Sequence, residues 1–95
     1  MVRMRLGNGA AKPPSRPEDQ PLFEQALRDR LDRAGAGGIE TDVAWMARPL
    51  PGFRVTLREG PRTETFGVPV KVLAGDRDGR TLDRIVADAL RRLRR

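Results

Sequence analysis

Apolar and polar residues alternate in three short segments in the middle of the chain, residues 42–48, 52–58 and 62–72. Alternation with a period of two is typical of β-strands, whose successive side chains point to opposite faces of a sheet. Each segment therefore has one apolar face, and together they predict a sheet with one side turned to a core. The residues expected on that side are Val43, Trp45, Ala47, Phe53, Val55, Leu57, Phe66, Val68, Val70 and Val72.

The links between these segments are short, which predicts antiparallel neighbours. Residues 48–52 form a rigid, proline-rich link, and residues 59–61 form a turn. Pro69 has no backbone N–H to donate, so the third segment should lie at an edge or end its regular pairing there. A register shifted by one residue would move Trp45 to the outer face and create a surface on which nucleic-acid bases could stack.

Two further segments, residues 21–34 and 82–94, have the apolar spacing of amphipathic helices. Pro21 suits the first turn of the first helix, and the glycines of residues 35–38 are expected to end it. Thr81 is expected to cap the second helix, since its hydroxyl can accept a backbone N–H of the first turn.

Arg30 interrupts the apolar arc of the first helix. A long arginine can keep its charged head in water at the rim of a core. Alternatively, it can pair with a carboxylate of the sheet, such as Asp42 or Glu64. The sequence leaves both interpretations open.

The inferred order of elements is α-β-β-β-α. The simplest packing puts both helices on the apolar face of a three-stranded antiparallel sheet, which predicts a two-layer α+β fold. Residues 21–95 are expected to form this single domain. Residues 1–20 contain glycines and prolines without a periodic apolar pattern, so we expect a disordered basic arm there.

The net charge of +6 is concentrated at the two ends of the chain. Residues 1–17 and residues 91–95 each carry four basic residues and no acid, whereas the middle has a slight acidic excess. The outer face of the sheet is expected to add Arg48, Arg54, Arg58 and Lys71. Such clusters suit an anionic partner, although abundant arginine is also typical of GC-rich coding sequences.

Several kinds of chemistry are excluded by the residue types that are missing. The chain has no histidine, cysteine or tyrosine, and its one serine, Ser15, lies in the arm. Ser–His and Cys–His nucleophiles and ordinary zinc sites are therefore absent. We expect no enzymatic activity, no cofactor and no metal site. No apolar run approaches the roughly 20 residues of a membrane span, so we expect no membrane partner and a cytoplasmic location.

The element order is similar to that of double-stranded RNA-binding domains, and the resemblance covers residues 21–95 in element order alone. In that family a basic cluster at the start of the second helix contacts phosphates. The corresponding segment here is residues 80–84, in which Asp83 lies between two arginines, and Asp76 and Asp78 precede it.

The composition and charge distribution favour a small module that binds nucleic acid, or associates with it, through phosphate contacts of low sequence specificity. The alternative is a structural or adaptor subunit of a larger assembly, such as a phage particle, a secretion system or a multisubunit complex. An inhibitor or antitoxin that binds a protein belongs to the same alternative, and an edge strand also permits a homo-oligomer. The residues expected to contact nucleic acid are Arg3, Arg5, Arg48, Arg54, Arg58, Arg91, Arg92, Arg94 and Arg95.

Overall fold

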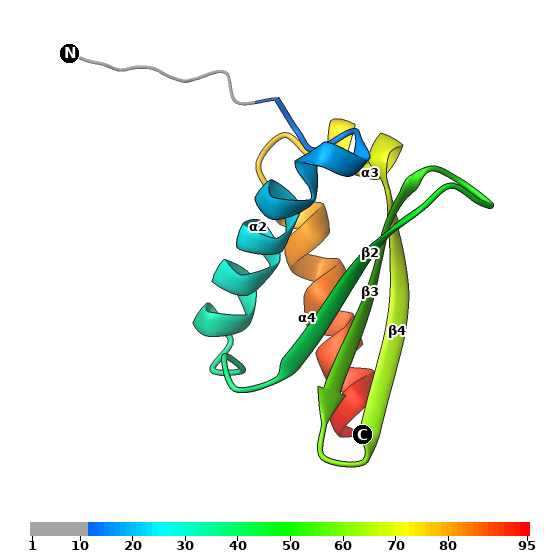
Figure 1. Cartoon of the computed structure of the whole chain (residues 1–95). Coiled ribbons are helices and arrows are strands. Elements are labelled where there is room, and N and C mark those ends of the chain that lie inside the picture. The colour runs from blue at the N-terminus through cyan, green and yellow to red at the C-terminus, as the bar shows by residue number, and fades with distance from the viewer. Residues whose placement is uncertain (1–11) are drawn as a thin grey trace.

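A computed structural model describes residues 12–95 and confirms a small α+β fold (Figure 1). Three antiparallel strands form one sheet, and helices lie against one of its faces. Residues 1–11 of the expected arm lie outside the described residues, while residues 17–19 form a 3₁₀ turn. The elements in order are η1 (Pro17–Asp19), α2 (Gln20–Arg33), β2 (Glu40–Met46), β3 (Gly52–Glu59), β4 (Arg62–Pro69), α3 (Val70–Ala74) and α4 (Arg80–Arg94).

The sheet has the strand order β2-β3-β4, with β3 in the centre. Val55 of β3 lies opposite Val43 and Phe66, which places the three expected apolar faces on one side. Trp45 lies opposite Phe53 on this side, and the two rings meet edge to face with centroids 5.3 Å apart. The predicted inward position of Trp45 is therefore confirmed, whereas Ala47, expected on the same face, lies beyond β2 and is exposed.

The core forms where α2 and α4 cover this apolar face (Figure 1). Phe23 of α2 stacks on Phe53 with centroids 4.6 Å apart, and both side chains are completely buried. Leu27 and Leu31 continue this contact along α2, while Val86 and other apolar residues of α4 fill the remaining side. Burial of each large side chain contributes roughly 1.5–3 kcal/mol, so this layer is the main source of stability.

The third strand is shorter than predicted, because β4 ends at Pro69 and residues 70–74 form the short helix α3. Val70 donates its N–H to Pro51 O at 2.9 Å, after which the chain turns and buries Leu73. Proline cannot donate to a ladder, and Pro69 does end the pairing of an edge strand, as predicted. Val70 and Val72 therefore belong to a helical turn and not to the sheet.

The first strand lies two residues earlier than expected, at Glu40–Met46. Arg48 therefore follows the strand and lies in the exposed link to β3. The earlier start adds Glu40 to the outer face, opposite Arg58. The outer face within the strands then carries Glu40 and Asp42 as well as Arg54 and Arg58, so the expected basic bias of that face is wrong.

Helix α4 begins one residue before Thr81, and its cap is not the predicted one. Gly79 occupies the cap position with a positive φ of 79°, a conformation that favours glycine. The carboxylate of Asp76 accepts the N–H groups of Thr81 and Leu82, both at 2.9 Å. The acidic turn of residues 76–79 thus performs the capping function expected of Thr81.

Candidate nucleic-acid interface

The C-terminal arginines lie at the end of the sheet that contains the β3–β4 turn. Arg94 donates two hydrogen bonds to the carboxylate of Glu59, at 3.0 and 3.1 Å. Arg92 Nε lies 2.6 Å from Glu64 Oε2. These contacts join α4 to β3 and β4, and we call this region the paired end, defined by Glu59, Glu64, Arg92 and Arg94.

The ion pairs at the paired end form where the β3–β4 hairpin and helix α4 meet. The hydrogen bonds from Arg94 lower the pKa of Glu59, although partial desolvation acts in the opposite direction. Arg91 pairs with Asp88 of the preceding helical turn. Three of the arginines expected to contact phosphate are therefore already neutralised by carboxylates of the same chain.

Arg58 is also held by carboxylates on the outer face of the sheet. It pairs with Asp42, and its Nε lies 3.6 Å from Glu40 Oε1. The hydrogen bond to Asp42 and its negative charge raise the pKa of Arg58. Arg58 thus belongs to a cluster that spans β2 and β3, in which two carboxylates surround one arginine.

Arg95, the last predicted contact residue, takes part in a contact of the helix terminus. Arg62 donates to the backbone oxygens of Leu93 and Arg95, at 3.3 and 3.0 Å. The last carbonyls of a helix have no partner within the helix, so a donor from β4 satisfies them. This contact engages the backbone of Arg95 and not its guanidinium.

Three basic side chains lie at the opposite end of the sheet, where Met46, Gly52 and Pro69 are aligned by the strand register. Arg48 and Lys71 follow Met46 and Pro69 by two residues, and Arg54 lies two residues beyond Gly52. Within residues 12–95, none of the three makes an ion pair or a side-chain hydrogen bond, and all three are exposed. We call Arg48, Arg54 and Lys71 the basic end.

Arg54 lies on the outer face between Ala44 and Gly67, its partners on the neighbouring strands. Neither residue carries a charge or a bulky side chain. Arg54 is exposed and has no acid directly opposite it, although the side chain of Met46 covers the neighbouring position above Gly67. This environment differs from that of Arg58, four residues further along the same strand.

The described chain also begins near the basic end. Pro13 and Pro14 line the same hollow of about 400 Å³ as Leu73 and Ala74 of α3. The arm that carries Arg3 and Arg5 thus joins the folded part on this side, although both arginines lie outside the described residues. Arg77, in the link between α3 and α4, adds another exposed basic side chain nearby.

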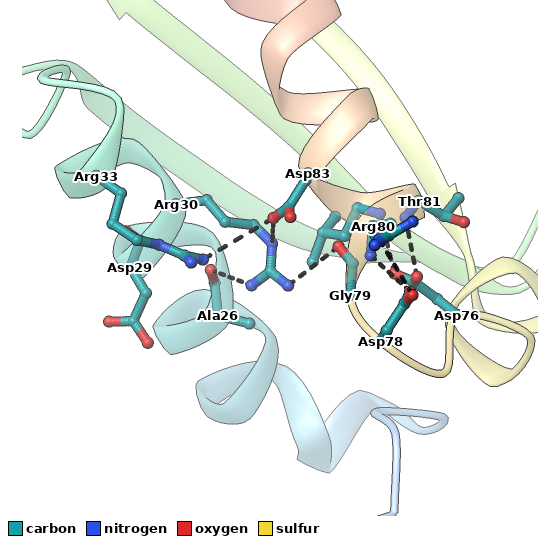
Figure 2. A network of polar contacts seen from close by, with 11 residues as sticks. Ala26, Asp29, Arg30, Arg33, Asp76, Asp78, Gly79, Arg80, Thr81 and Asp83 are labelled. Atoms are coloured by element: carbon teal, nitrogen blue, oxygen red, sulfur yellow. Dashed lines mark hydrogen bonds and ion pairs between the residues drawn. The ribbon is translucent and has the colours of Figure 1, made fainter.

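Acidic residues at this end bind backbone groups at the start of α4 (Figure 2). Partial desolvation alone would raise the pKa of Asp76, but the N–H groups of Leu82 and Thr81 outweigh it and lower the pKa. Asp78 accepts the N–H of Arg80 at 3.1 Å, and its carboxylate also lies 3.3 Å from Arg80 Nε. These carboxylates are thus held by the helix terminus.

The contacts of Arg30 differ from both sequence-based expectations (Figure 2). Its Nε lies 2.8 Å from Asp83 Oδ1 of α4, although the N–H is not aligned for a hydrogen bond. Its other nitrogens donate to Ala26 O at 2.9 Å and to Gly79 O at 3.4 Å. The partner is thus the second helix and not Asp42 or Glu64 of the sheet, and Arg30 links α2 to α4.

The segment that corresponds to the basic cluster of double-stranded RNA-binding domains is largely occupied by these contacts. Arg80 pairs with Asp78, and Asp83 pairs with Arg30. Arg84 is exposed on the next part of the helix. The start of α4 therefore offers a weaker basic surface than the basic end at the sheet.

Among residues 12–95, no group of acidic side chains is arranged to hold a metal ion. No helix in this range is both long and apolar enough to cross a membrane. Comparison with protein-family models, curated proteins and solved structures finds no match to this chain.

Sequence reasoning placed Lys71 on the outer face of the sheet but not among the contact residues, and it missed the pairing of Glu59 with Arg94 and of Glu64 with Arg92. The acids could have been found, because a two-residue turn at Gly60 and Pro61 places both near one end of the sheet. The position of Lys71 depends on α3, whose alternating apolar residues resemble a continued strand. Its position in a helical turn therefore had no clear signal in the sequence.

Proposed function

We propose that this protein is a small, non-enzymatic module that binds the phosphate backbone of nucleic acid through its basic end and its basic N-terminal arm. The observation that carries the proposal is the contrast in pairing. Arg48, Arg54 and Lys71 have no carboxylate partner within residues 12–95, whereas Arg58, Arg91, Arg92 and Arg94 have one. The proposal places the protein in the cytoplasm, where nucleic acid is accessible.

The physical reason is counterion release. A basic side chain that is not neutralised within the protein can displace counterions from a phosphate backbone. The release of these counterions drives binding. An arginine that already pairs with a carboxylate must first give up that partner, so it gains less. Contacts of this kind read the charge of the backbone and carry little sequence information.

The proposal is tested by titration of the full chain against duplex DNA, duplex RNA and single strands, at low and physiological salt. The expected result is binding whose log affinity falls linearly with log salt, with a slope that reports several phosphate contacts. A chain that begins at Lys12 should bind more weakly, because it lacks Arg3 and Arg5. Absence of binding to every substrate at physiological salt would contradict the proposal.

A second candidate function, an adaptor in a protein assembly, is favoured by a different observation. The outer edge of β4 is not paired with any strand in the described part of the chain. An open edge can accept a strand from a partner through backbone hydrogen bonds. Pull-down from cells with and without nuclease would separate the two functions, because an adaptor keeps its partner after nucleic acid is removed.

A further inference from the structure

The backbone groups at the outer edge of β4 follow from the strand register. Glu59 and Arg62 flank the two-residue turn, so they form a hydrogen-bonded pair in the antiparallel ladder. Hydrogen-bonded and non-bonded positions alternate from there. The N–H and C=O groups of Thr63, Thr65 and Gly67 therefore point away from β3, toward the open edge.

The outer edge of β2 differs, because a side chain already occupies it. The same alternation turns the backbone groups of Val43 outward, and Gln20 Nε2 of α2 donates to Val43 O at 3.0 Å. Figure 1 shows α2 on the side of the sheet where β2 lies. Within the described chain, β2 is thus partly protected, whereas no comparable contact is made to the outward groups of β4.

Prolines limit the open edge of β4 on both sides. Pro61 and Pro69 each lie four residues from Thr65 and share its outward parity. Neither has an N–H, so each ends the row of donors. The edge between them has no charged residue at its outward positions, although charge is a common protection of natural edge strands.

We propose that this edge pairs with β4 of a second copy of the chain, in an antiparallel arrangement with the two-fold axis at Thr65. Thr65 then lies opposite Thr65 of the other copy, and Thr63 lies opposite Gly67. The two bracketing prolines also meet each other, so the pairing uses the whole open segment. The product is one continuous six-stranded sheet with an isologous interface.

The side chains near this axis are compatible with such a pairing. Glu64 would lie opposite Phe66 and Arg62 opposite Val68, so no like charges are directly opposed. Glu64 is already neutralised by Arg92. A second copy is the occupant that this register fits, because Pro61 and Pro69 lie at equal separations on either side of Thr65.

The net charge of +6 opposes association of two copies. Added salt screens this repulsion over a Debye length of about 8 Å at physiological ionic strength. The dimer should therefore tighten as salt rises, whereas binding to nucleic acid should weaken. This opposite dependence separates the edge interface from the proposed function.

The test is sedimentation equilibrium of the full chain over a concentration series, at low and at physiological salt. The expected mass approaches twice the 10.6 kDa of one chain as concentration rises. Thr65→Pro removes an outward N–H without removing a bond to β3, and should weaken the dimer by at least about tenfold. Circular dichroism confirms that each variant remains folded.

Thr65→Lys provides a second route, since it places two like charges opposite each other and keeps the backbone N–H. Ala44→Lys is its matched control, because Ala44 lies on the same outer face but on the other edge strand. The proposal requires that Thr65→Lys weakens the dimer and Ala44→Lys does not. A chain that stays monomeric at every concentration and salt, or a dimer unaffected by Thr65→Pro, overturns it.

Discussion

Both ends of the sheet carry basic residues, but these residues differ in whether they have a partner within the same chain. At the paired end, Arg92 and Arg94 bind Glu64 and Glu59, and Arg62 binds the last carbonyls of α4. At the basic end, Arg48 and Arg54 have no such partner in the described chain. Composition alone does not separate these two groups of arginines.

The number of arginines in a chain is therefore a poor guide to an interface. At the paired end the guanidinium groups fasten a terminal helix to a hairpin, and exposed pairs of this kind usually stabilise a fold only slightly. At the basic end the charge remains available to a ligand. The packing of α4 against the hairpin determines the pairing at the paired end, because it brings Glu64 and Glu59 within reach of Arg92 and Arg94.

The largest expected effect is a loss of stability that disrupts both ends of the sheet, because both depend on the same core. Phe53→Ala deletes a completely buried ring that stacks on Phe23 and contacts Trp45. The expected loss is about 3–5 kcal/mol, a large part of the stability of a domain of this size. Urea unfolding measures it.

Leu50→Ala is the control for this prediction, because Leu50 lies in the exposed link beside the basic end and is 39% exposed. It should change stability by no more than about 0.5 kcal/mol. Equal losses for the two variants would show that the described core does not hold the ends in place.

The next effect concerns the acids of the basic end, which stabilise a helix and do not neutralise Arg48 or Arg54. Asp76→Ala should cost about 1 kcal/mol, because the N–H groups of Thr81 and Leu82 lose their acceptor. Asp78→Ala should cost less, since Asp78 accepts one N–H in an exposed position. Thermal unfolding of both variants checks this order, and the reverse order would contradict the assigned cap.

A smaller effect is expected at low pH, where a carboxylate at each end of the sheet should lose its contribution to stability. The pKa values of Asp76 and Glu59 are lowered from 3.8 and 4.5, so the folded state favours their charged forms. Their stabilisation is present above these ordinary values and is lost as pH falls through the lowered pKa values. Unfolding measured from pH 6 to pH 2 should show it.

Asp76→Asn isolates the contribution of the basic end to this acid response. The variant should be less stable than the parent near pH 6, and the two should converge as pH falls below about 4. A constant difference in stability over the whole range would mean that Asp76 is not held in its charged form by the helix.

The smallest predicted effect converts part of the paired end into a basic surface. Glu59→Gln with Glu64→Gln releases Arg94 and Arg92 from their charged partners, so the slope of log affinity against log salt should steepen by up to about 2. Asp29→Asn with Asp32→Asn changes the net charge equally on α2, away from these arginines. An equal steepening in the control would show that net charge matters and pairing does not.

Much of the fold follows from local patterns in the sequence. Alternation around Phe53 and Val55 identifies a strand, the turn at Gly60 and Pro61 joins it to the next strand, and Pro69 marks the end of pairing. Helix α3 could not be predicted, because Val70 and Val72 continue the alternation of the strand before them. There the N–H of Val70 reaches Pro51 O and Leu73 becomes buried, which are tertiary contacts.

The candidate site was less predictable than the fold for a related reason. Arg92 and Glu64 are 28 residues apart, and Arg94 and Glu59 are 35 residues apart. Ion pairs over such separations depend on where a helix crosses a sheet, which periodicity does not report. The arginines could be listed from the sequence, but their availability depends on the packing of α4.

The most direct test compares the salt dependence of nucleic-acid binding for two triple variants. One replaces Arg48, Arg54 and Lys71 by alanine, and the other replaces Arg91, Arg92 and Arg94. The first variant should reduce the slope of log affinity against log salt by about 3, and the second should reduce it by less than about 1. Equal reductions, or a larger one for the C-terminal variant, would contradict the claim that pairing determines which arginines bind.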